Sequence, residues 1–173
     1  GNLIKGSFRI KKDNSYTILL NDLSDNRNLQ PVKYYIKALY DSNPSIELVY
    51  PKQDVNLAID SRVPIEVKLN DDYGFSKLVL NYKLSSSRYE PAQEKFSSIE
   101  ISIDKKIKEQ IVDHIWNLTQ LNPAVNDVYS FYLEIFDNDD VSGPKSAETQ
   151  TINVRFPSLD EILSQADETQ NNV

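Results

Sequence analysis

The chain has 173 residues, of which 39% are hydrophobic and 26% charged, a composition typical of one soluble globular domain or two small ones. Its 19 basic and 26 acidic side chains give a formal net charge of -7, which argues against nucleic-acid binding, because that requires a basic surface. With no Cys, the sequence excludes disulfides, thiolate metal sites and cysteine nucleophiles, and no apolar run approaches the roughly 20 residues that span a bilayer.

The charge divides the chain into three segments. Residues 1–42 hold 7 basic and 4 acidic side chains, residues 43–157 hold 12 and 18, and residues 158–173 hold no basic and 4 acidic ones. We therefore expect a small N-terminal unit over 1–42, a main domain over 43–157 and a short C-terminal stretch over 158–173.

The N-terminal segment carries three candidate strands. Residues 7–10 form a short one, and apolar side chains alternate with others over 16–20 and 34–40. Three strands bury little surface by themselves. The segment is therefore expected to be a partial or small β unit, such as the closing strands of a preceding module.

The middle segment shows the period-two alternation of half-buried strands. Val63, Ile65, Val67 and Leu69 alternate with polar neighbours or proline, and the same pattern recurs along the segment. The candidate strands cover residues 46–50, 55–59, 63–69, 78–84, 99–103, 129–135 and 149–156. About seven short strands at this spacing predict an all-β antiparallel sandwich of immunoglobulin or fibronectin type III kind.

Residues 105–121 are ambiguous. Their isoleucines recur at near-helical spacing, whereas Val112, His114, Trp116 and Leu118 alternate as they would in a strand. We favour a strand over about 110–118, because the strand that follows it in the sandwich needs a partner.

The C-terminal segment changes to a helical pattern. Ser158 and Glu161 have the spacing of a capping box, with Pro157 ahead of it. The apolar stripe of the short helix would be Ile162, Leu163 and Ala166, and the remaining residues are polar. So short a helix is marginal in isolation.

Motifs of catalysis are lacking. No glycine-rich phosphate loop, nucleophile elbow or zinc-binding His motif occurs in the sequence. The single His, His114, has Trp116 nearby in the expected strand, which favours a half-buried sheet residue over a catalytic base. The sequence therefore predicts that the chain is not an enzyme.

Carboxylates form the one cluster with possible metal chemistry. The loops after the strands at 63–69 and 129–135 lie at the same end of such a sandwich, where the chain also enters the domain from residues 41–44. Together these loops contribute Asp41, Asp71, Asp72, Asp137, Asp139 and Asp140. Calcium takes 6 to 8 oxygen ligands, so a Ca²⁺ site of cadherin-like type is one interpretation. The other is that these are turn residues that bond their own backbone.

Ten Tyr and one Trp would suffice for a carbohydrate platform, but most lie on the buried face of their strands. Tyr73, Tyr89 and Tyr132 are the exceptions and could contact a sugar. Packing in the core or across strands is the alternative.

Several strings resemble a bacterial family of unknown function, common in Bacteroidetes. They are residues 71–78 (DDYGFSKL), 115–118 (IWNL), 132–139 (YLEIFDND), 141–147 (VSGPKSA) and 155–161 (RFPSLDE). Members of that family are large membrane-anchored envelope proteins with tandem immunoglobulin-like modules followed by long helical regions. The resemblance covers about residues 44–163. It departs at residues 123–127, where the family has a shorter Pro-Gly-Asp turn, and it supplies no catalytic residues.

The resemblance and the residue patterns lead to one expectation. The chain is a non-catalytic structural or protein-interaction module, cut from a larger membrane-anchored protein on the periplasmic or extracellular face of a bacterial envelope. Its partner is a protein, nucleic acid is not expected, and any membrane contact is made through segments outside this sequence. No cofactor is expected unless calcium binds, and the alternatives are a calcium-dependent junction or adhesion module and a carbohydrate-binding module.

Overall fold

The protein is an all-β chain that divides into two compact units, Gly1–Tyr40 and Asp41–Val173. The computed structural model describes residues 5–57, 61–140, 143–158, 160, 161, 163 and 164. The division lies two residues before the boundary expected from the charge distribution.

The N-terminal unit contains one β-hairpin, formed by β1 (Asn14–Thr17) and β2 (Lys33–Ile36) in antiparallel pairing. The rings of Tyr16 and Tyr34 stack across the pair at 5.0 Å. Both strands are shorter than expected, and residues 7–10 form no strand. After β1 the chain leaves the ladder because the Asn28 side chain bonds the backbone of Ile18 and Leu20 instead.

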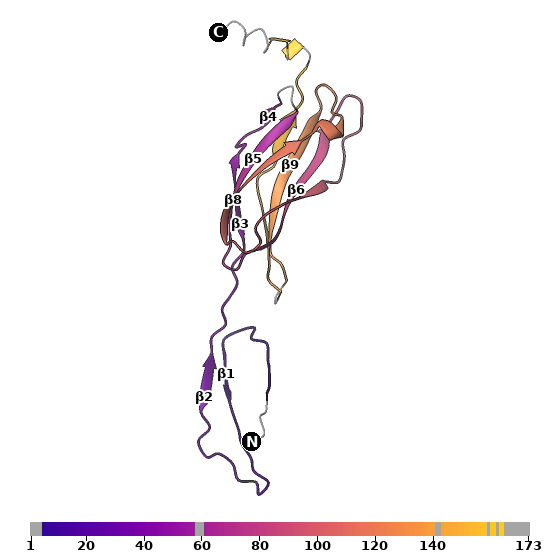
Figure 1. Ribbon diagram of the computed structural model, residues 1–173. Helices are drawn as coiled ribbons and strands as arrows, with labels where there is room; N and C mark the ends of the chain where they lie inside the picture. The colour runs from indigo at the N-terminus through magenta and orange to yellow at the C-terminus, as the bar shows by residue number, and fades with distance from the viewer. Residues whose placement is uncertain (1–4, 58–60, 141–142, 159, 162, 165–173) are drawn as a thin grey trace. The chain divides into compact units, whose positions relative to one another are not determined.

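The second unit is a sandwich of two sheets (Figure 1). A three-stranded sheet has the order β3-β5-β8, and a larger sheet has the order β4-β11-β9-β6-β7, with β10 also paired to β9. All neighbours are antiparallel except β4 and β11. The strands are β3 (Ser45–Tyr50), β4 (Val55–Asn56), β5 (Arg62–Asn70), β6 (Phe75–Ser86), β7 (Ser97–Ile101), β8 (Glu109–Asn117), β9 (Val128–Asp137), β10 (Ser146–Glu148) and β11 (Ile152–Arg155).

The predicted alternation places the core between the sheets. The four aliphatic residues at 63, 65, 67 and 69 on β5 are buried, as are Phe131, Leu133 and Ile135 on β9. The indole ring of Trp116 lies 5.4 Å from the ring of Tyr82 and 5.2 Å from that of Phe131. This aromatic cluster joins β8 of one sheet to β6 and β9 of the other.

The prediction of a strand rather than a helix near residues 110–118 is confirmed by β8. The strand is followed by a 3-10 turn, Thr119–Leu121, and by Asn122 in the left-handed region. The strand found within the expected range 149–156 is shorter, covering Ile152–Arg155. The alternation does not reveal β10, because Ala147 is the only apolar residue in that strand. Of the expected strand over 55–59, residues 58–60 lie outside the described residues.

The capping box at the C-terminal helix is confirmed in its two defining bonds. Glu161 N–H donates to Ser158 Oγ at 3.2 Å, and Ser158 N–H donates to Glu161 Oε2 at 2.7 Å. Glu161 also receives two bonds from the Arg155 guanidinium, which ties the helix start to β11. Of the expected apolar stripe, Leu163 is exposed, and Ile162 and Ala166 lie outside the described residues.

Replacing Phe131 with Ala should lower the free energy of unfolding by about 3–5 kcal/mol, because the ring is fully buried against Trp116. The measurement is chemical denaturation followed by the fluorescence of the single Trp. Tyr89→Ala is the control, since that side chain is 73% exposed and its loss should cost less than about 0.5 kcal/mol. Equal losses in the two variants would contradict this placement of the core.

Candidate functional site

The loops at one end of the sandwich gather around the ammonium group of Lys145. Its Nζ donates to Asp137 Oδ2 and Asp139 Oδ2, each at 3.4 Å, and to Asp41 Oδ2. Asp41 lies where the chain enters the sandwich, Asp137 ends β9, and Asp139 lies in the loop that follows. We call these four residues the Lys145 cluster.

Asp137 is the fixed point of this cluster, because its side chain is fully buried at the end of β9. Its Oδ1 accepts the backbone N–H of Asp139 at 3.2 Å and that of Lys145 at 2.8 Å. The carboxylate thus bonds both arms of its loop as well as the Lys145 ammonium. Asp137 therefore behaves as the turn residue that one interpretation of the sequence predicted.

The loop between β5 and β6 is built in the same way. Asp71 Oδ2 accepts the N–H groups of Tyr73 at 2.9 Å and Gly74 at 2.7 Å. Gly74 has φ +104°, and a Cβ there would lie 2.6 Å from the Lys105 carbonyl oxygen, so the turn requires glycine. Asn138 Nδ2 donates to the Tyr73 carbonyl at 3.1 Å, which links this loop to the Lys145 cluster.

The electrostatics of the cluster are set by burial and by the arrangement of opposite charges. Hydrogen bonds to Asp41, above all, and to the other two carboxylates hold the pKa of Lys145 above its usual value. Burial raises the pKa of Asp41, although the Lys145 ammonium opposes this shift, and the neighbouring carboxyl of Asp72 raises it further. Asp72 in turn accepts the backbone N–H of Ser42 at 3.3 Å.

The structure therefore brings Asp41, Asp72, Asp137 and Asp139 to one end of the sandwich, together with Asp71 in its own turn, while Asp140 is exposed. A cation does lie among these carboxylates, but it is the side chain of Lys145. Within the described residues, no group of three or more His, Cys, Asp or Glu side chains is arranged to hold a metal ion. A calcium ion would have to compete with this ammonium group, and calcium binding stays a prediction.

Lys145 is the residue that the sequence did not reveal as part of the site. The sequence signal for Lys145 is weak: it is the one basic residue near the Asp-rich loop, and it follows Gly143 and Pro144. Oδ1 atoms of Asp41, Asp71 and Asp72 are buried in the described structure without a hydrogen-bond partner. Such oxygens normally find one, so this end of the sandwich is costly to form.

The three candidate tyrosines lie in different settings. Tyr73 is 47% exposed and has the Lys108 ammonium 5.7 Å from its ring centre, while Tyr89 is 73% exposed. Tyr132 packs edge-on against Phe96 at 5.1 Å. No ring contact joins the three to one another in the part of the chain that the structure describes, and carbohydrate binding stays a prediction.

A second surface feature is the outer face of the β3-β5-β8 sheet. Tyr50, Ile111 and Ile115 are 50%, 62% and 61% exposed on this face. Tyr50 and Ile115 line a small depression together with Pro64 and His114. His114 is half-buried, and burial lowers the pKa of its imidazole.

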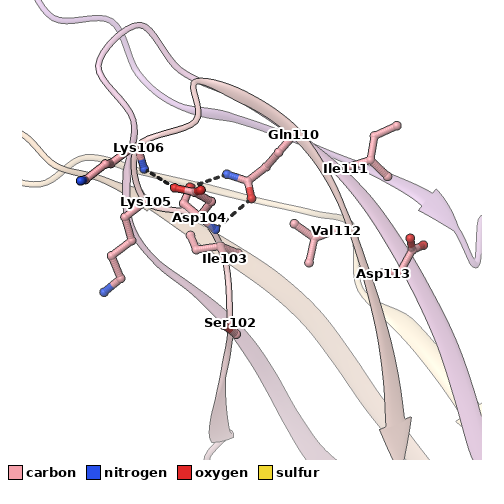
Figure 2. Close-up of a pocket in the computed structure, with 9 residues that line it drawn as sticks. All are labelled: Ser102, Ile103, Asp104, Lys105, Lys106, Gln110, Ile111, Val112 and Asp113. Atoms are coloured by element: carbon pink, nitrogen blue, oxygen red, sulfur yellow. Dashed lines mark hydrogen bonds between the residues drawn. The ribbon is translucent and has the colours of Figure 1, made fainter.

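Beside this face lies an open hollow between the end of β7 and the start of β8 (Figure 2). The Gln110 amide holds the connection in place, because it donates to the Asp104 carbonyl and accepts the Asp104 N–H. Ile111, Val112 and Asp113 of β8 line the hollow. The space beside residues 110–113 of β8 is therefore open.

The fold defines the chain as an all-β sandwich protein. A scan against protein-family models finds no match, and a search of curated proteins finds none either. Within the described residues, the chain forms no helix of the length and hydropathy that crossing a membrane requires.

Replacing Asp137 with Ala should lower the free energy of unfolding by about 1–3 kcal/mol, because the backbone N–H groups of Asp139 and Lys145 lose their buried acceptor. Asp140→Ala, at an exposed position, is the matched control and should cost less than about 0.5 kcal/mol. The double variant Asp137→Ala/Lys145→Met should lose less free energy of unfolding than the two single variants added together, because both substitutions remove the same Asp137–Lys145 ion pair. Additive losses in chemical denaturation would contradict the coupling.

Asp41 and Asp54 should titrate on opposite sides of the usual Asp pKa of about 3.9 in carboxyl-detected NMR. Burial raises the pKa of Asp41, and bonds from Asn153 N–H and Nδ2 lower that of Asp54.

The native protein then binds the Asp41 proton more tightly than the unfolded chain does. The contribution of Asp41 to the free energy of unfolding should therefore be fully present below the usual Asp pKa. It should decrease as the pH rises from that value through the raised pKa of Asp41. The contribution of Asp54 should be present above the usual pKa and be lost as the pH falls through the lowered one. Asp41→Asn should abolish the first effect, and an Asp41 pKa at or below the usual value would overturn the assignment.

Proposed function

We propose that the chain is a non-catalytic structural and protein-interaction module of a larger bacterial cell-envelope protein, with an immunoglobulin or fibronectin type III-like sandwich. The strand order supports the fold assignment. One sheet contains the first, third and sixth strands of the sandwich, β3, β5 and β8, and the other contains β4, β6, β7 and β9 with the closing strands. The separation of β3, β5 and β8 from β6, β9 and β11 resembles the division between the two sheets of immunoglobulin-like sandwiches.

The observation that carries the interaction role is the edge strand β8. It runs for nine residues, is bonded to β5 on one side, and exposes Ile111 and Ile115 on its outer face. A long edge strand with exposed aliphatic side chains is a template for pairing, which proteins usually cover or blunt. A protein partner on this face would bury the exposed isoleucines.

The envelope placement is supported by the sequence resemblance over residues 44–163. In such a protein the module would act as a spacer and as a surface for protein contact outside the cytoplasm. In this proposal the chain works on the periplasmic or extracellular face of the membrane. The parent protein is held there by segments outside this sequence.

A photo-crosslinking amino acid at position 115 should give one discrete protein adduct in the envelope fraction of the bacterium that encodes the chain. The same group at Glu94, an exposed loop position, is the control and should not give that adduct. Adducts identical at the two positions, or found in the cytoplasmic fraction, would contradict the proposal.

The crosslinked partner, once identified and purified, must bind the isolated chain. Ile111→Thr/Ile115→Thr should then weaken binding at least tenfold. A factor of ten corresponds to about 1.4 kcal/mol, which is less than the free energy gained by burying two isoleucine side chains. Unchanged affinity in the folded variant would exclude this face as the contact.

A further inference from the structure

The pairing register of β5 with β8 shows which backbone groups face the open edge. Leu118 N–H donates to the Ser61 carbonyl at 3.0 Å, and Asp71 N–H donates to the Lys108 carbonyl at 2.8 Å. Both bonds join residues that are directly opposite in the uninterrupted register between the two strands. Bonded pairs alternate along an antiparallel ladder, so the even-numbered residues of β8 bond β5.

The odd-numbered residues of β8 consequently point their N–H and C=O groups away from β5, and two of them, Ile111 and Asp113, line the hollow of Figure 2. The odd-numbered residues are Glu109, Ile111, Asp113, Ile115 and Asn117. Their side chains are also the exposed ones of this strand. Backbone donors and acceptors and an exposed row of side chains thus lie together along one edge.

The side chains in this row carry an unbalanced charge. Asp113 lies directly opposite Glu66 on β5, and Tyr50 of β3 lies opposite Glu66 on its other side. Glu109 has the Lys68 ammonium 2.9 Å away, but in the described part of the chain no Lys or Arg forms an ion pair with Glu66 or Asp113. Like charges opposite each other destabilise a sheet, and a cation beside Asp113 would relieve this.

A second copy of the same strand fits this edge poorly. In a twofold antiparallel pair, Ile111 opposes Ile115 in one register only, and that register sets Asp113 against Asp113. The next register on either side also keeps the exposed side chains of both copies on one face, but it places an isoleucine opposite an acidic residue. The registers that set Ile111 or Ile115 against its own copy pair only five residues of each β8 strand, so every register of self-pairing is disfavoured. The sandwich unit, with 12 basic and 23 acidic side chains over 41–173, favours a cationic partner.

We propose that the β8 edge is a strand-addition site that takes an extended segment of another protein. This segment carries Lys or Arg opposite Asp113 and aliphatic residues two positions away on each side, opposite Ile111 and Ile115. Main-chain bonds to the odd-numbered residues hold it, and the central cation sets its register. The inference rests on the proposed interaction function and names its partner class.

The test uses NMR of the full chain with a seven-residue peptide. The peptide has a central lysine, valine two residues away on each side and threonine elsewhere, and its control has glutamate in place of lysine. Before addition, the odd-numbered amides of β8 should exchange with solvent faster than the even-numbered ones. At millimolar concentration the lysine peptide should shift and protect the odd-numbered amides, and the glutamate peptide should not.

Three substitutions at one position separate charge from backbone pairing. Asp113→Lys should weaken the lysine peptide about fivefold or more and admit the glutamate peptide. Asp113→Pro removes a donor of the open edge but no bond to β5, and edge strands tolerate proline. It should therefore bind more weakly than Asp113→Asn, which keeps the N–H. Should Asp113→Pro fail to fold, Asp113→Lys and Asp113→Asn still test whether the charge at position 113 selects the lysine peptide.

Binding of both peptides alike, or no protection of the odd-numbered amides, would overturn the strand-addition site. Protection of these amides without peptide, with a dimer in sedimentation, would assign the edge to a second copy and also overturn the proposal. A crosslinked partner at position 115 combined with no peptide response would leave the interaction function standing and refute only strand addition.

Discussion

The uninterrupted pairing of β5 with β8 is the constraint on which the rest of the sandwich depends. Because side chains alternate along a strand, this one register places Val112 and Trp116 in the core and leaves Ile111 and Ile115 outside. It also determines which backbone groups remain unpaired. A slip by one residue would exchange the core and solvent faces of β8, and Trp116 would lose its contacts with Tyr82 and Phe131.

The Lys145 cluster lies where β9 ends and where the chain enters the sandwich before β3. Asp137 terminates β9 and is buried, so its charge must be neutralised, and the loop that it organises returns Lys145 to it. The third and fourth members of the cluster, Asp41 and Asp139, come from the chain entrance and from the loop itself. One ammonium group thereby connects the first residue of the sandwich unit to the loop between its last strands.

Local patterns account for what the sequence could predict. The alternation on β5 and β9 identified both strands and their buried faces, and the spacing of Ser158 and Glu161 identified the helix start. The gathering of Asp41, Asp72 and Asp137 followed from the topology assumed for the sandwich. Lys145 was missed because its importance depends on three carboxylates that are distant in sequence or folded back by the loop. The short strand β10 has too few side chains to show a period.

The open edge could not be predicted either, and this difference bears on function. Sequence alternation shows which face of β8 is buried, but not that β8 is the last strand of its sheet. Once the sheet order is known, the Lys145 cluster and the acidic residues at the β8 edge differ in whether the chain itself neutralises their charge. At the Lys145 cluster, carboxylates are neutralised from within the chain, and their geometry is fixed by backbone bonds to Asp137. At the β8 edge, Glu66 and Asp113 face each other beside unpaired backbone groups and exposed isoleucines. A partner that displaced Lys145 would only replace an ion pair that the chain already has. A partner at the β8 edge relieves the repulsion between Glu66 and Asp113, pairs the free backbone groups and buries apolar surface. The β8 edge is therefore better suited than the acidic end to bind a partner.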